Sequence, residues 1–244
     1  MLTVDINCDV GEGLDNEESL MPYISSCNIA CGAHAGSITT IDRVIKIALK
    51  NKVKIGAHPS FPDRENFGRT KINISPEALE ISLVNQIQTI QERLDLLGGT
   101  LHHVKIHGAL YNLSAVNEET AQVIVNSMQE VAPNTILYVP NNSTLEQIAI
   151  QNKLKTKREA FADRNYNNDL TLVSRSQDNA VITDKNEVIN HLSEMIFHQQ
   201  VKTISNTLVP IQPETYCVHG DNKEAITLVK YIHQSLSDKG VKIA

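Results

Sequence analysis

A lysine and a histidine end a short β-branched run at Lys105-Ile106-His107, and Gly108 follows directly. Side chains alternate along a strand, so Lys105 and His107 should point to the same side. Lysine is rarely buried without a partner, and a cation beside a titratable imidazole can bind an anion or take part in proton transfer. The simpler interpretation is a solvated strand end, which is the commoner state of an isolated lysine or histidine.

The same pattern, an apolar run ending in histidine beside glycine or proline, recurs at His34, His58 and His219. If these runs are parallel strands of a barrel, the residues at their ends meet on the face where barrel enzymes have their active sites. A core would not tolerate so many polar groups without partners, so the sequence predicts a titratable pocket. The residues expected on this face are Asp9, Glu12, His34, His58, Asp63, Lys105, His107, Asp163, Arg164, His219 and Asp221.

Asp63 and Arg69 belong to a loop whose course Pro59 and Pro62 constrain. The two charged side chains could pair simply to hold this loop, or they could contact a substrate. The sequence leaves both roles open.

Two chemistries fit these residues. In metal-assisted hydrolysis, Asp9 and two of the histidines would bind a divalent ion that activates water. In metal-free acid/base chemistry, a carboxylate or imidazole would activate water, and Lys105 or Arg164 would stabilise an oxyanion or bind phosphate. Spacing cannot decide, because the groups come from separate strands. The sequence contains no G-x-x-x-x-G-K-[ST] phosphate loop and no G-x-S-x-G elbow, which disfavours a self-contained P-loop ATPase or serine hydrolase.

Composition narrows the class of protein. The chain has 244 residues, 41% of them hydrophobic, and a net charge of −6, so nucleic acid and anionic membranes are not expected as large-surface partners. The four cysteines, at 8, 27, 31 and 217, lie in or beside apolar runs, which predicts reduced core thiols in a cytoplasmic protein rather than a zinc site at Cys27 and Cys31. No leader and no apolar run of membrane-spanning length is seen, so neither export nor a membrane span is expected.

Periodicity predicts seven strands separated mostly by helices. The strands are expected at residues 2–7, 27–31, 53–57, the run ending at His107, 135–139, 158–162 and 213–218. Helices are expected from Ser37 or Thr39 to about 51, and at 76–97, 117–131, 143–152, 186–198 and 222–236. The helix at 76–97 is expected to start at Pro76 after an N-cap at Ser75 and to end at Gly98-Gly99, with Ile81, Val84, Ile87, Ile90, Leu94 and Leu97 on its apolar face. Runs at 170–173 and 180–182 suggest a small hairpin, and His191 and His198 are expected on the surface.

Alternating strands and helices without a linker indicate one domain, residues 1–244, built of β/α units. An open doubly wound sheet is the alternative, but no glycine fingerprint follows the first strand. We therefore expect a β/α barrel, incomplete or irregular in form.

Seven stretches of the chain resemble the LamB/YcsF family, and they run in the family's order. They are residues 5–12, 28–36, 55–63, 67–69, 104–112, 161–164 and 217–221. The resemblance implies a distorted seven-stranded β/α barrel of the glycoside hydrolase/deacetylase type. It also implies a subunit of an ATP-dependent 5-oxoprolinase, which acts with partner subunits B and C. This enzyme opens the lactam of 5-oxo-L-proline to L-glutamate and hydrolyses ATP to ADP and phosphate.

In that scheme Asp9 or His58 would be the base, and Lys105, His107 and Arg164 would hold anionic groups. The substrate-binding residues would be Glu12, His34, Asp63, Arg69, Asp163, Arg164, His219 and Asp221. A divalent metal is left open, with Asp9, His58 and His107 as its ligands if one binds, and the partners are expected to carry much of the ATP step. The rival interpretations are a stand-alone metal-dependent deacetylase or amidase and a non-catalytic subunit that organises its partners.

Several positions depart from the family pattern. Ala33 stands where Phe is usual, Ser37 where Asp is common, Ile106 where Pro is common, and Leu170 and Ser174 where Gly and Pro are frequent. Ser37 weakens any role for an acid at that position. Asn179 can adopt the left-handed conformation that glycine often supplies.

Overall fold

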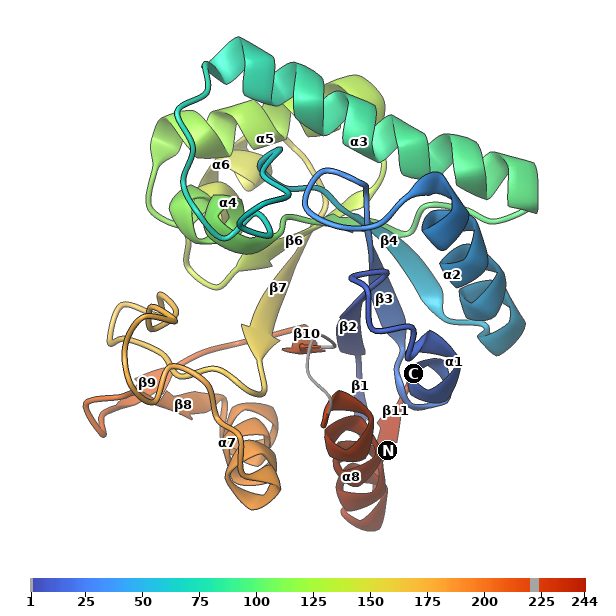
Figure 1. The fold of residues 1–244 in the computed structure, drawn as a ribbon. Helices are drawn as coiled ribbons and strands as arrows, with labels where there is room; N and C mark the ends of the chain where they lie inside the picture. Colours follow the sequence, from blue (N-terminus) through green and yellow to red (C-terminus); the bar gives the residue numbers. More distant parts are fainter. Residues whose placement is uncertain (1, 220–223) are drawn as a thin grey trace.

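Seven parallel strands form a closed barrel in the order β10-β2-β3-β4-β5-β6-β7 (Figure 1). The structure is a computed structural model and describes residues 2–219 and 224–244. The barrel strands are β2 (Ile6–Val10), β3 (Ser26–Ala30), β4 (Lys54–His58), β5 (His103–Lys105), β6 (Ile136–Pro140), β7 (Thr156–Phe161) and β10 (Thr215–Val218). The predicted seven-stranded β/α barrel is confirmed, and of the incomplete or irregular forms that were expected the structure excludes the incomplete one, because the barrel is closed.

The first strand differs from the prediction. Residues 2–7 are divided between β1 (Leu2–Val4), which pairs with β11 (Val241–Ile243) outside the barrel, and β2, which continues to Val10. Asp9 therefore lies on a barrel strand, opposite Asn28 of β3, and not in the loop where it was expected. A strand in a closed barrel is covered on both faces, so polar residues that point into the barrel can still belong to the strand. In the sequence alone these polar residues resemble the start of a loop.

Helices surround the barrel and cover its apolar outer face (Figure 1). The longest, α3, packs between α2 and α5. The helices are α1 (Glu17–Leu20), α2 (Ile38–Asn51), α3 (Pro76–Leu97), α4 (Gly108–Ser114), α5 (Glu118–Val131), α6 (Thr144–Gln151), α7 (Lys185–His198) and α8 (Ala225–Asp238), with a 3₁₀ turn, η1, at Met21–Tyr23. Among residues 2–219 and 224–244, no helix has the length and apolar character needed to cross a membrane.

The helix ends confirm the capping predictions. Ser37 accepts a hydrogen bond from the Thr40 backbone N–H, and Ser75 accepts one from Ala78 before Pro76 starts α3. Gly98 ends α3 in the left-handed conformation, with φ of +76°. One predicted detail of α3 is wrong, because Ile81 is 63% exposed. The buried face instead contains Leu79, Leu83, Ile87, Ile90 and Leu94.

The barrel interior is polar at both ends. At the amino-terminal end, Asp5 accepts hydrogen bonds from Ser26 Oγ and Thr215 Oγ1, at 2.8 and 2.7 Å. Apolar side chains point outward to the helices, and the four cysteines are buried, unpaired thiols, as predicted. The core lies between strands and helices, which leaves the inside of the barrel for polar groups.

Residues 162–214 form an excursion after β7 that was predicted incorrectly. The runs 170–173 and 180–182 do not pair as a hairpin, because each bonds back to the chain just after β7, at Tyr166↔Leu172 and Arg164↔Val181. A different hairpin joins β8 (Gln200–Lys202) to β9 (Leu208–Pro210). Asn179 has the expected positive φ, of 60°.

His191 was expected on the surface, but the structure shows it half-buried. Its ring stacks on Tyr166, with 6.1 Å between ring centroids, and its Nε2 is buried without a hydrogen-bond partner. Packing of α7 against the excursion covers this position, which helical periodicity alone does not reveal.

Candidate functional site

A cleft of about 450 Å³ opens at the carboxyl ends of the barrel strands. Most of the residues expected on this face line it, namely Asp9, Glu12, His58, Lys105, His107, Arg164 and His219, and the expected substrate-binding residue Arg69 lines it as well. His34 and Asp163 are buried against cleft residues, through contacts with Glu12 and His219 respectively. Asp63 does not line the cleft. Asp221 lies outside the described residues.

Lys105 forms the charged floor of the cleft and is only 1% exposed. Its Nζ lies 2.8 Å from Asp9 Oδ1 and 3.2 Å from Glu159 Oε1, and it donates to Cys217 Sγ at 2.9 Å. Burial alone would lower the pKa of Lys105, but the neighbouring acidic groups outweigh it and raise this pKa well above its usual value. The solvated interpretation of this strand end is therefore wrong.

Asp9 connects the lysine to the histidines. Its Oδ1 accepts from Lys105 Nζ and from Asn28 Nδ2, both at 2.8 Å, while its Oδ2 lies 3.3 Å from His58 Nε2. Burial raises the pKa of Asp9, but the charges of His58 and Lys105 oppose this more strongly and hold the pKa well below its usual value. Asp9 is therefore an ionised carboxylate with one oxygen directed at the imidazole.

His58 and His107 meet through ring nitrogens that have no backbone partner. His58 Nδ1 donates to the Lys105 carbonyl at 2.7 Å, and His107 Nε2 donates to the Phe67 carbonyl at 2.9 Å. The other two nitrogens, His58 Nε2 and His107 Nδ1, lie 3.0 Å apart. Burial, followed by the charge of His58, lowers the pKa of His107 well below its usual value, so His107 is neutral at pH 7.

His34 stacks flat on His107, with ring centroids 3.8 Å apart, and its Nε2 lies 3.1 Å from Glu12 Oε1. Burial lowers the pKa of His34 to about 3. The described residues contain two groups whose ligand atoms could hold a metal ion: Asp9 with His58 and His107, and Glu12 with His34 and His107. These two groups share His107.

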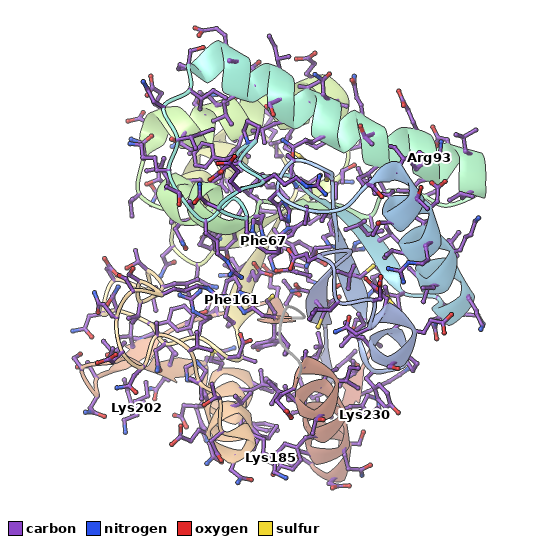
Figure 2. All side chains as sticks on the ribbon, viewed as in Figure 1. Phe67, Arg93, Phe161, Lys185, Lys202 and Lys230 are labelled. Carbon is purple, nitrogen blue, oxygen red and sulfur yellow. The ribbon has the colours of Figure 1, made fainter. Side chains whose placement is uncertain are left out.

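Aromatic rings wall the charged cluster on two sides. Phe67, whose ring lies 5.4 Å from both His34 and His107, and Phe161 both lie near the middle of the view in Figure 2. Phe161 stacks on His219 and lies 5.1 Å from Lys105 Nζ. Low-polarity walls strengthen the electrostatic interactions between the groups they enclose.

Two predicted residues have clear structural partners. Arg164 donates from Nε to the Ala180 carbonyl and from Nη2 to the Val173 carbonyl, so much of its guanidinium holds the excursion in place. Asp163 accepts from the His219 backbone N–H at 3.0 Å and contacts His219 Nδ1 at 2.9 Å. Burial raises the pKa of Asp163, but the contacts with His219 outweigh it and lower this pKa.

The Asp63 loop is held internally. Asp63 Oδ1 accepts from the backbone and side chain of Asn66, and Asp63 Oδ2 is buried without a hydrogen-bond partner. Arg69 lies over the Phe67 ring at 4.8 Å and lines the cleft. The suggested pairing of Asp63 with Arg69 is not among the ion pairs of the described residues.

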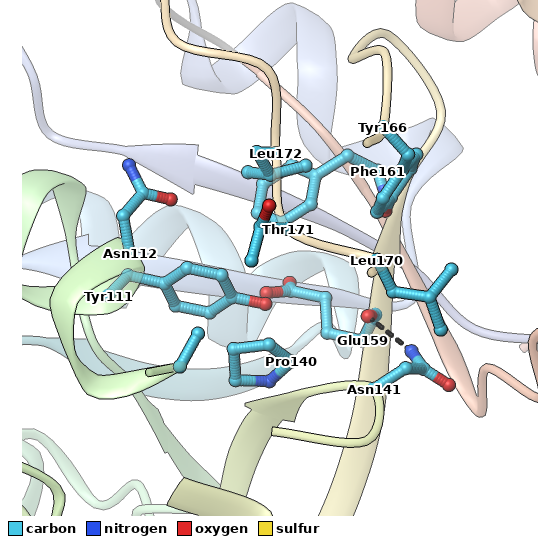
Figure 3. A pocket seen from close by; sticks show the side chains of 11 residues that line it. Tyr111, Asn112, Pro140, Asn141, Glu159, Phe161, Tyr166, Leu170, Thr171 and Leu172 are labelled. Atoms are coloured by element: carbon cyan, nitrogen blue, oxygen red, sulfur yellow. Dashed lines mark hydrogen bonds between the residues drawn. The ribbon is translucent and has the colours of Figure 1, made fainter. Parts of the chain in front are cut away.

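Sequence reasoning missed the residues that surround Lys105 inside the barrel. Glu159 is 2% exposed, and burial raises its pKa. Its Oε1 accepts from Asn7 Nδ2 at 2.9 Å. Its Oε2 and the Tyr111 hydroxyl face each other in a small cavity (Figure 3), both buried and without hydrogen-bond partners. A glutamate inside the predicted strand 158–162 was the available signal.

His103 was also missed, because it was given no role. It is fully buried, its Nε2 lies 2.6 Å from Asn28 Oδ1, and its ring stacks on Tyr138 at 4.0 Å. A Cβ at Gly56 would lie 2.2 Å from this ring, so glycine there makes room for it. His103 therefore supports Asn28, which in turn holds Asp9. Its position two residues before Lys105 on the strand was the signal.

Comparison with known proteins gives a consistent result. The profile of the LamB/YcsF family matches residues 4–244. The A subunit of 5-oxoprolinase from Haemophilus influenzae (strain PittEE) is 42% identical over 243 residues, covering 100% of this chain and 99% of that protein. The A subunit of 5-oxoprolinase from Bacillus cytotoxicus is 37% identical, covering 99% of this chain and 98% of that protein. The crystal structure of the lactam utilization protein from Thermus thermophilus superposes with a TM-score of 0.93 at 32% identity, covering 99% of each chain.

Proposed function

The chain belongs to the LamB/YcsF family, and from this premise we propose that it hosts lactam ring opening in an ATP-dependent 5-oxoprolinase. The observation that carries the proposal is the full-length similarity to 5-oxoprolinase A subunits, joined to a cleft in which an ionised carboxylate, an ammonium and imidazoles converge. The reaction converts 5-oxo-L-proline to L-glutamate and hydrolyses ATP to ADP and phosphate.

The chemistry of the lactam explains why ATP is needed. An amide carbonyl is a poor electrophile, and phosphorylation of its oxygen makes the carbonyl carbon reactive towards water. As the ring C–N bond breaks, the nitrogen takes a proton and becomes the amino group, which leaves an acyl phosphate. A second water hydrolyses this acyl phosphate to glutamate and inorganic phosphate. General acid and base groups at the reacting atoms typically contribute about 10²–10⁴ in rate.

The cleft residues fit these tasks. Asp9 and His58 lie 3.3 Å apart at the cleft floor, and we assign the general base to this pair. Lys105 is the cation beside Asp9, placed to stabilise negative charge that develops on the carbonyl oxygen. His107 completes the constellation, because its Nδ1 lies 3.0 Å from His58 Nε2, the same nitrogen that Asp9 contacts.

Cations near the cleft mouth suit the anionic groups of substrate and phosphate. Arg69, Arg164 and Arg175 line the cleft. A neighbouring cavity of about 640 Å³ shares Arg69, Arg175 and His219 with it. Guanidinium groups bind carboxylate and phosphate in a bidentate manner, so we assign Arg69 and Arg175 to the carboxylate of 5-oxoproline and the transferred phosphoryl group.

Nucleotide handling is assigned to the partners, subunits B and C, because the sequence lacks a phosphate loop. The test is ATP-dependent glutamate release from 5-oxoproline, measured with each subunit omitted in turn. We expect release only from the complete set. Release that persists without this chain would refute the assignment of ring opening to it.

A paired substitution tests the site. Asp9→Asn keeps the side-chain shape but removes the charge, and we expect glutamate release to fall at least 100-fold, the lower end of a typical general-base contribution. Asp5→Asn is the matched control, because Asp5 lies on the same chain segment but bonds Ser26 and Thr215 at the other end of the barrel. Turnover by Asp9→Asn within a few-fold of the control would remove Asp9 from the reaction.

A further inference from the structure

When both rings are neutral, no proton is available to form a hydrogen bond between His58 and His107. Each ring has already donated one N–H to a backbone carbonyl, His58 to Lys105 O and His107 to Phe67 O. A carbonyl oxygen can only accept, so the protonated nitrogens are fixed as His58 Nδ1 and His107 Nε2. In the neutral rings, His58 Nε2 and His107 Nδ1 are then both acceptors, yet they lie 3.0 Å apart. Two lone pairs at this distance repel unless a cation lies between them.

Carboxylate oxygens surround the same point. Asp9 Oδ2 lies 3.3 Å from His58 Nε2, and Glu12 Oε1 lies 3.5 Å from His107 Nδ1. Together with the two imidazole lone pairs, these two carboxylates place four hydrogen-bond acceptors around one point.

The spacing matches a coordination shell. Ligand atoms bound to one ion at about 2.1 Å lie roughly 3.0 Å apart at right angles and roughly 3.4 Å apart in a tetrahedron. The 3.0 and 3.3 Å separations fall in this range, and the 3.5 Å separation to Glu12 lies just above it. Little rearrangement would therefore be needed to place an ion among these atoms.

Outer contacts orient the ligand atoms as they do in known metal centres. A metal-binding histidine commonly donates its second N–H to a backbone carbonyl, and a ligating carboxylate is itself hydrogen-bonded. Here Lys105 Nζ and Asn28 Nδ2 hold Asp9 Oδ1, which leaves Oδ2 directed at the cluster. On the other side, His34 Nε2 contacts Glu12 Oε1 at 3.1 Å.

We propose that this chain binds one divalent transition-metal ion through His58 Nε2, His107 Nδ1 and Asp9 Oδ2, with Glu12 as the nearest further ligand. Two imidazoles with carboxylate oxygens favour zinc, manganese, iron or cobalt over calcium and magnesium, which prefer oxygen alone. When bound, such an ion would supply Lewis acidity and lower the pKa of coordinated water. Asp9 and His58 would then act by holding the ion, and the coordinated water would take over the role of the activated nucleophile. The inference goes beyond the proposed function and does not depend on the identity of the substrate.

The test is metal binding by the isolated chain, without partners or substrate. Protein stripped with chelator is dialysed and titrated separately with Zn²⁺, Mn²⁺ and Co²⁺ by calorimetry, and Co²⁺ binding is also followed by its visible absorption. We expect one equivalent per chain with at least one of these ions, and a rise in melting temperature. Absence of stoichiometric binding at 100-fold molar excess of each ion would overturn the proposal.

Variants assign the ligands. His107→Ala and His58→Gln should each weaken binding at least 100-fold, whereas His198→Ala, which removes an exposed histidine at the end of α7, should bind like the wild type. Binding that survives both site substitutions would place the ion elsewhere and refute the assignment. Should either variant fail to fold, nitrogen NMR of the wild-type histidines decides the matter, because ion binding must shift His58 Nε2 and His107 Nδ1. A pair of unshifted resonances, with His58 protonated on both nitrogens, would identify a proton in place of the metal.

Discussion

Replacing Lys105 by methionine removes the cation that two buried carboxylates share. Its Nζ lies 2.8 Å from Asp9 and 3.2 Å from Glu159, and at an effective dielectric constant near 20 each contact is worth roughly 5–6 kcal/mol before desolvation. Relief of the ammonium's own burial offsets part of this. Breaking such a buried pair typically costs about 3–5 kcal/mol, because the remaining charge is left uncompensated. We therefore expect Lys105→Met to lower the free energy of unfolding by about 3–5 kcal/mol at pH 7.

Glu159→Gln should by itself change stability by only about 1 kcal/mol, because relief of the cost of burying the Glu159 charge offsets the lost attraction to Lys105. Asp9 still compensates the ammonium, and Asn7 can still donate to the amide oxygen. In the double variant, one of the two uncompensated carboxylates is gone. The combined loss should therefore be smaller than the sum of the single losses, by about 1–3 kcal/mol. Urea denaturation followed by circular dichroism measures all four proteins.

The pH dependence supplies a second check on Lys105→Met. In this variant we expect the carboxyl pKa values of the folded state to lie above the unfolded values near 4, so folding takes up protons. The stability of the variant therefore rises relative to the wild type, and the difference in free energy of unfolding between the two shrinks, as the pH falls towards about 4. The wild type moves the opposite way, because the lowered pKa of Asp9 stabilises the fold at neutral pH and this contribution is lost in acid. Additive losses in the cycle, or a deficit that does not depend on pH, would refute the picture of a shared buried cation.

Two further predictions concern stability. Gly108→Ala places a Cβ 2.5 Å from Gly68 O at a φ of +62° and should lower the free energy of unfolding by about 2–4 kcal/mol. In the control Gly240→Ala, φ is +73° and no atom lies within 4 Å of the new Cβ, so only the left-handed strain of about 1–2 kcal/mol is expected. Equal losses of the two variants in urea denaturation would contradict the close approach at Gly108. Burial lowers the pKa of His191 from 6.5 to about 4, so the unfolded state binds more protons between these values and the wild type should lose up to about 3 kcal/mol as the pH falls from 6.5 to 4. His191→Phe should keep the ring packing and be less sensitive to pH over that interval, and an unchanged pH profile would place the titration elsewhere.

Local rules were sufficient to predict much of the fold. Apolar runs gave the barrel strands, and Ser75, Pro76 and Gly98 marked the ends of α3 where the structure has them. The same rules placed His34, His58, Lys105 and His107 at strand ends, because the position of a side chain along its own strand is set by its immediate neighbours in sequence.

The partners of these groups depend on closure of the barrel, which no local rule contains. Lys105 meets Asp9 from 96 positions away and Cys217 from 112 positions away, because pairing of β10 with both β2 and β7 brings the chain ends together. In the sequence Glu159 and His103 look like ordinary strand residues, but the closed barrel encloses both. Helical periodicity predicts His191 to be exposed, but the excursion covers its ring. The sequence thus determined which groups face the cleft. Burial and long-range contacts, which exist only in the closed fold, decided the charge states of these groups and brought the lone pairs of His58 and His107 together.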